Sequence, residues 1–178
     1  MQSLLALLLT LVYFPGGAWQ EADVRAAAAQ AGQILGQCGI APVKIELLRA
    51  DVDARYRVFH IPTSREFARK LKPSKPAVYF VDDTREDPPF DAVAIGRSNS
   101  RGMPELRDTV WVAHGTRDLA VALAHELAHV LMDSGEHADE PGNLMRDETA
   151  PGSDRLTEAQ CARLRETGAG NGLLKPAR

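Results

Sequence analysis

Hydrophobic and polar positions divide this chain into short strands and a few helices. Residues 43–48 alternate apolar and charged side chains, which is the period of a half-buried strand. Residues 77–81 form a nearly unbroken apolar run, typical of an interior strand covered on both faces. Residues 21–37 place apolar side chains at helical intervals. The other predicted elements are strands at 55–61 and 109–113, a short apolar segment at 92–95, and helices at 64–71, 118–132 and 156–167.

An apolar run at residues 4–14 is too short to cross a membrane as a helix, and it is followed by the small residues Gly16 and Ala18. This pattern predicts a secretory signal peptide at residues 1–18, although no lysine or arginine precedes the run. An N-terminal membrane anchor and a buried strand are the alternatives. We therefore expect an exported protein, periplasmic or secreted, with no stable membrane association once the signal is removed.

The composition supports a single globular domain, since 44% of the 178 residues are hydrophobic and 25% are charged. The net charge of -3, without a local run of lysine or arginine, argues against nucleic acid as a partner. We expect a monomer with one domain at residues 19–168. Residues 169–178 lack a pattern and are expected to form a flexible tail.

Two cysteines, Cys38 and Cys161, are expected to form a disulfide bond in an oxidising compartment. Closing a loop of this size adds about 4 to 5 kcal/mol of stability on the chain-entropy model. Neither cysteine has the spacing of a metal site or a histidine beside it, so a thiol nucleophile is not indicated. Two unrelated buried thiols are the alternative.

The candidate chemistry lies in the stretch His125-Glu126-Leu127-Ala128-His129. Residues four apart share one face of a helix, so the two imidazoles can point at one zinc ion while Glu126 stands beside it. A catalytic zinc ion takes three protein ligands, and His137 is the candidate for the third. Gly135 can let the chain turn back after the helix. The alternative is a buried helix with two core histidines and a solvated glutamate.

This arrangement, with strands in the front half, the two-histidine helix, a third histidine and then Asn143-Leu144-Met145, resembles the metzincin clan of zinc endopeptidases, with a matrixin type of methionine turn. The resemblance implies an α+β fold: a twisted mixed β-sheet of about four to five strands packed on an N-terminal helix and a buried active-site helix, with a small C-terminal helical subdomain. It implies one catalytic Zn²⁺ bound by His125, His129 and His137, with Glu126 as the general base and Met145 as the turn methionine.

The sequence departs from the clan's pattern at several positions. The usual glycine and third ligand would fall at Met132 and Gly135, so the third histidine arrives two residues late. Some relatives place a tyrosine two residues after the methionine, where this chain has Asp147. Rival third ligands within the same stretch are Asp133, Glu136 and Asp139.

We expect the protein to be an exported zinc-dependent endopeptidase that acts on a peptide or protein substrate. The residues 92–95 would serve as an edge strand that holds an extended peptide. The alternatives are a gluzincin-like peptidase, with Glu148 or Glu158 as third ligand, and a non-catalytic zinc-stabilised binding protein.

The acidic loop that begins at residue 82 is the candidate for a structural calcium site, but the sequence does not support calcium binding there. The spacing of its carboxylates matches no calcium loop, so a solvated loop is expected. The acidic residues concerned are Asp82, Asp83, Glu86 and Asp87.

Overall fold

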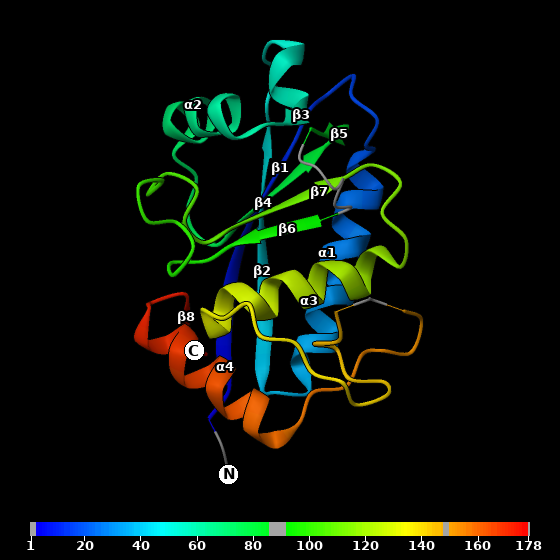
Figure 1. Ribbon diagram of the computed structural model, residues 1–178, viewed down its shortest axis with the longest axis vertical. Helices are drawn as coiled ribbons and strands as arrows, with labels where there is room; N and C mark the ends of the chain where they lie inside the picture. The colour runs from blue at the N-terminus through cyan, green and yellow to red at the C-terminus, as the bar shows by residue number, and fades with distance from the viewer. Residues whose placement is uncertain (1–2, 86–91, 148–149, 178) are drawn as a thin grey trace.

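The computed structural model describes residues 3–85, 92–147 and 150–177, which form a mixed β-sheet with helices on both faces (Figure 1). In their order across the sheet, the strands are β2 (Ile40–Arg49), β1 (Leu5–Tyr13), β4 (Ala77–Val81), β7 (Thr109–Ala113) and β6 (Ala92–Ile95). The first four are mutually parallel, whereas β6 runs antiparallel to β7 at the edge. The expected α+β class with a mixed sheet is therefore confirmed.

Strand β1 is the part of the sheet that differs most from expectation. Residues 5–13 were predicted to lie in a signal peptide, yet they form an interior strand between β2 and β4, with Leu7, Leu9 and Leu11 fully buried. The following segment is also tied to the domain, because Ala18 donates its backbone N–H to Asp82 Oδ1 at 2.7 Å. The structure thus favours the buried-strand alternative over a domain boundary at residue 18. A short apolar run has the same hydropathy in either role.

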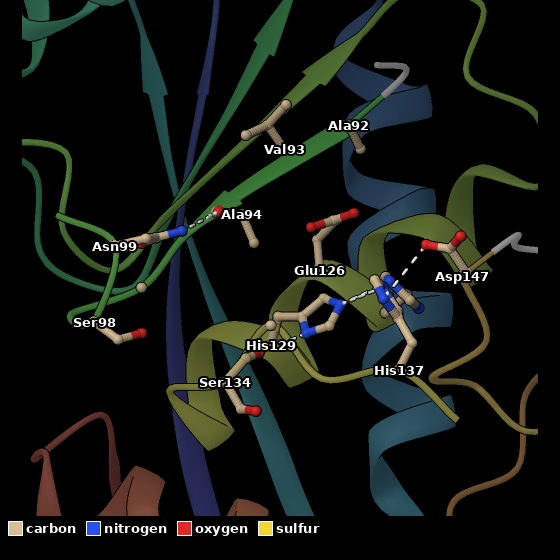
Figure 2. A pocket seen from close by; sticks show the side chains of 13 residues that line it. Ala92, Val93, Ala94, Ser98, Asn99, Glu126, His129, Ser134, His137 and Asp147 are labelled. Atoms are coloured by element: carbon tan, nitrogen blue, oxygen red, sulfur yellow. Dashed lines mark hydrogen bonds and ion pairs between the residues drawn. The ribbon is translucent and has the colours of Figure 1, made fainter. Parts of the chain in front are cut away.

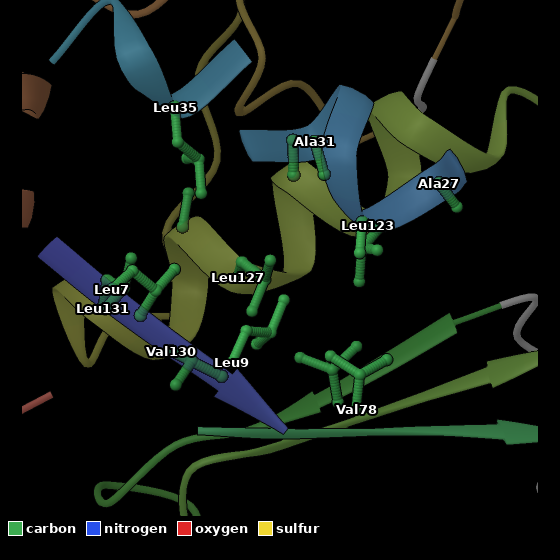
Figure 3. Packing of buried hydrophobic residues seen from close by; sticks show 14 of the residues in the cluster. Leu7, Leu9, Ala27, Ala31, Leu35, Val78, Leu123, Leu127, Val130 and Leu131 are labelled. Carbon is green, nitrogen blue, oxygen red and sulfur yellow. The ribbon is translucent and has the colours of Figure 1, made fainter. Parts of the chain in front are cut away.

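Side-chain alternation along the strands gives the sheet two buried faces. On one face, α1 (Glu21–Gly36) and α3 (Leu119–Met132) cover side chains such as Leu9 and Val78 (Figure 3). On the other, α2 (Ile61–Leu71) covers a cluster that includes Tyr79 and Trp111, whose rings stack at 3.9 Å. The interior character predicted for 77–81 follows from this double cover.

The region predicted as a strand at 55–61 is mostly a different structure. Ala54–Arg57 form a short 3₁₀ helix, η1, whose first turn is capped by the Asp53 carboxylate accepting from Arg55 N at 2.9 Å. Of this range, the residues that pair as a strand are those of β3 (Val58–Phe59), which pairs with β5 (Asp83–Thr84) in a separate two-stranded sheet. The local hydrogen bond to Asp53 competes with strand formation, which alternation alone does not reveal.

The C-terminal region is more ordered than expected. Helix α4 (Glu158–Gly170) lies in the region predicted as a helix and is preceded by Thr157, which forms a capping box with Gln160. Strand β8 (Leu174–Pro176) pairs antiparallel with β1 where a flexible tail was predicted. The expected disulfide bond between Cys38 and Cys161 is present and joins α4 to the end of α1. No helix within the described residues has the length and apolar character needed to cross a membrane.

Candidate metal centre

Helix α3 supplies the first two residues of the site. Its apolar side chains, such as Leu123 and Leu127, face the sheet and are fully or almost fully buried. The spacing of four residues then brings His125 and His129 to one point, where both line the same cleft as residues 92–94 of β6. Both imidazoles are nearly buried, with 3% and 8% of their residue surface exposed.

The end of α3 directs the chain back toward these histidines. Ser134 N donates to His129 O at 3.2 Å and Asp133 N donates to Val130 O at 3.3 Å, the paired bonds of a Schellman turn. Asp133 adopts the left-handed conformation that this turn requires, with φ at 47°. Gly135 has no positive φ, so the expectation that this glycine makes the turn was wrong. Asp133 is favoured there because its carboxylate accepts from Ser98 N at 2.9 Å.

His137 completes a cluster of three imidazoles. The Nε2 atom of His129 lies 2.9 Å from Nε2 of His125 and 3.2 Å from Nε2 of His137. Three nitrogens bound to one tetrahedral zinc ion are about 3.3 Å apart, given Zn–N bonds of about 2.0 to 2.1 Å. The two separations from His129 are therefore close to this value, and the ligand atoms of all three histidines lie within 4.8 Å of one another.

The other ring nitrogens fix the tautomers that metal binding needs. His125 Nδ1 donates to Leu144 O at 2.7 Å, and His129 Nδ1 donates to Ser134 O at 2.6 Å. Each Nε2 then keeps its lone pair for a metal. Burial lowers the pKa of His129 to about 4 and also lowers the pKa of His125, so both rings are neutral near pH 7. The donor set thus fits zinc.

Asp147 is a contact of the site whose role the sequence did not indicate. Its carboxylate Oδ1 lies 3.4 Å from Nδ1 of His137, and the Asp147 side chain is 87% exposed. The sequence shows only that no tyrosine stands at this position. Asp147 lies close to His137 only because of the path that the chain takes between the two residues.

Glu126 lies between the histidines and strand β6 (Figure 2). Burial of its carboxyl raises the pKa to about 7, and a hydrogen bond from the backbone of Ala94 partly opposes that rise. A carboxyl with a pKa near neutrality can both accept and return a proton at physiological pH.

These residues line a cleft of about 270 Å³. One wall is the edge strand β6, and the opposite wall is formed by α3, the turn after it and Asp147. The edge strand expected at 92–95 therefore does lie beside the histidines.

The turn at residues 143–145, where the resemblance places a methionine turn, packs against the same segment. Met145 is 1% exposed and belongs to the main core cluster. Its carbonyl oxygen accepts from Ala138 N at 2.8 Å, which ties the turn to the residue after His137.

The rival ligands have other surroundings. Asp133 accepts from Ser98, and Glu136 pairs with Arg163. Within the described residues, the group of metal-capable side chains contains the three histidines and neither Asp139 nor Glu158. Glu148 lies outside the described residues, as do Glu86 and Asp87 of the acidic loop. In that loop, Asp82 accepts from a backbone amide.

No protein-family model and no curated protein match this sequence. The structure is similar to the crystal structure of metalloproteinase-II from Bacteroides fragilis, with a TM-score of 0.60 and 18% sequence identity. The match covers 93% of this chain and 54% of that chain, so this chain spans about half the length of that protein. At this identity the likeness concerns the fold, which is one that a metalloproteinase uses.

Proposed function

We propose that this protein is a zinc-dependent endopeptidase of metzincin type, with His125, His129 and His137 as ligands. The observation that carries the proposal is the convergence of three Nε2 atoms, two of them on rings whose Nδ1 atoms are bound to carbonyl oxygens. The similarity of the fold to a metalloproteinase supports the same assignment. A bound zinc ion would supply Lewis acidity toward a carbonyl oxygen and would acidify a water molecule.

Glu126 is the proposed general base. Its carboxylate faces the cleft, where it can take a proton from an attacking water and deliver it to the leaving amine. A purely structural zinc site has no need of a carboxylate in this position.

Strand β6 is the proposed substrate-binding edge. Within the described residues it pairs with β7 alone, and an extended peptide would add to its other edge by main-chain hydrogen bonds that replace those of the Ala94 backbone to Glu126 and to Asn99 Nδ2. The proposed substrate is therefore a peptide or an unfolded segment of a protein.

Export also belongs to the proposal. The disulfide bond between Cys38 and Cys161 is compatible with an oxidising, exported compartment. The segment first interpreted as a signal peptide gives no support, because residues 5–13 are a strand of the sheet.

The test combines metal analysis with a peptide-library assay of the purified protein. We expect one zinc ion per chain and cleavage of peptides. Glu126→Gln should keep the zinc and lower the rate by about 10² to 10⁴, since it removes only the proton acceptor. His137→Ala should lose the metal as well. Tight zinc binding with no cleavage of any peptide would instead favour a non-catalytic, zinc-stabilised binding protein.

A further inference from the structure

The methionine turn is held from behind by a side chain of α4. Asn143 donates from Nδ2 to Gln160 Oε1 at 3.0 Å, and Gln160 Nε2 donates to Asn143 Oδ1 at 3.2 Å. The two amides thus pair face to face. Asn143 is 5% exposed, so water cannot readily replace this partner.

Asn143 in turn sets the backbone of the residue that contacts the first histidine. Its Oδ1 accepts from Met145 N at 2.8 Å, so the side chain bridges the peptide units on either side of Leu144. The backbone N–H of Leu144 donates to Arg155 O at 2.6 Å, and its carbonyl oxygen accepts from His125 Nδ1. The orientation of that carbonyl decides where the His125 ring points.

Gln160 is itself fixed by its place at the start of α4. Its Oε1 accepts from Thr157 N at 2.8 Å, and its backbone N–H donates to Thr157 Oγ1 at 3.2 Å. The next residue, Cys161, is joined by the disulfide bond to Cys38, which follows the end of α1. The amide of Gln160 is therefore presented from a helix end that is held in place on both sides.

We propose that Gln160 is a positioning residue of the metal centre. It holds Asn143, and through the turn at 143–145 it holds the Leu144 carbonyl that orients His125. This inference rests on the proposed function, because it assumes that the histidines bind zinc.

The experiment compares two variants that both lose part of the capping box. Gln160→Ala removes the contact with Asn143, whereas Thr157→Ala removes the hydroxyl cap and leaves the paired amides intact. Both should lower the Tm. Only Gln160→Ala should weaken zinc binding, on the order of tenfold in competition with a chromogenic chelator. It should also change the visible spectrum of the Co²⁺-substituted protein.

Gln160→Glu separates positioning from helix capping in a folded protein. Glutamate can still accept from Thr157 N and from Asn143 Nδ2, but it cannot donate to Asn143 Oδ1. We expect a Tm lowered by no more than in Gln160→Ala, because the contact with Thr157 N is kept, together with zinc binding weaker than in the wild type. Zinc affinity and a Co²⁺ spectrum equal to those of the wild type in both Gln160 variants would overturn the inference. A wild-type protein that binds no zinc would overturn the proposed function first.

Discussion

The left-handed backbone of Asp133 decides where the chain goes after the histidine helix. With φ at 47°, this residue closes the Schellman turn that starts the path to His137. Most side chains are sterically strained in this left-handed conformation because of their Cβ atom. Glycine has no Cβ atom and avoids the strain, but the nearby glycine of this segment is at position 135 and not at 133. The sequence placed the turn at the glycine because glycine is the usual residue, whereas here a hydrogen bond to Ser98 stabilises an aspartate.

Asp133→Ala should therefore lower the free energy of unfolding by about 1 to 3 kcal/mol, from left-handed strain and the lost acceptor for Ser98 N. Asp133→Asn is the matched control, because asparagine tolerates this conformation and keeps a side-chain oxygen. Urea denaturation measures both. Equal decreases in unfolding free energy in the two variants would contradict a role of the left-handed conformation of residue 133 in stability.

Lys75 should make the free energy of unfolding depend on pH in the alkaline range. Burial lowers its pKa to about 8, although the attraction of Asp108 partly opposes the shift. Between this value and the ordinary 10.5, the unfolded chain binds more protons than the folded chain. The contribution of Lys75 to stability therefore rises as the pH rises from about 8 to about 10.5.

Lys75→Met should remove this dependence. As the pH rises through that window, the unfolding free energy of the wild type should increase relative to that of the variant. Urea titrations at several pH values between 7 and 10.5 measure it. A difference that is constant with pH would contradict the lowered pKa.

At the scale of elements, β1 has the most consequences for the fold. Neighbouring residues of a strand face opposite sides, and Leu9 is fully buried while Leu8 is 45% exposed. Leu9→Ala should cost about 2 to 5 kcal/mol of stability, and Leu8→Ala less than about 1 kcal/mol. Thermal unfolding measures both. If this segment were a removed signal peptide, neither change would affect the mature protein.

Local patterns predicted elements well where one interaction dominates. The spacing of His125 and His129, the helix that carries them and the interior strand at 77–81 all follow from periodicity. The clustering of His137 with them was also expected, and the three rings do converge. Patterns failed where a tertiary partner decides, as for β8, which is extended because it pairs with β1. No local signal could show that Asp147 reaches His137.

At the scale of the whole molecule, the disulfide bond joins parts that are 123 residues apart in sequence. The paired Cys38→Ser and Cys161→Ser substitutions should lower the unfolding free energy by up to about 5 kcal/mol, because the unfolded chain loses a long closed loop. Wild-type protein in reductant is the matched comparison. Unfolding midpoints equal to those of the oxidised wild type would contradict a stabilising bond.

The pairing of β8 with β1 also brings the two described ends of the chain together, since Ala177 N donates to Leu4 O at 3.0 Å. The first and last described residues of the domain are therefore neighbours in space. A short peptide could join these ends, and circularly permuted forms that begin in an exposed loop would keep every strand of the sheet. Partners fused to both ends would emerge side by side.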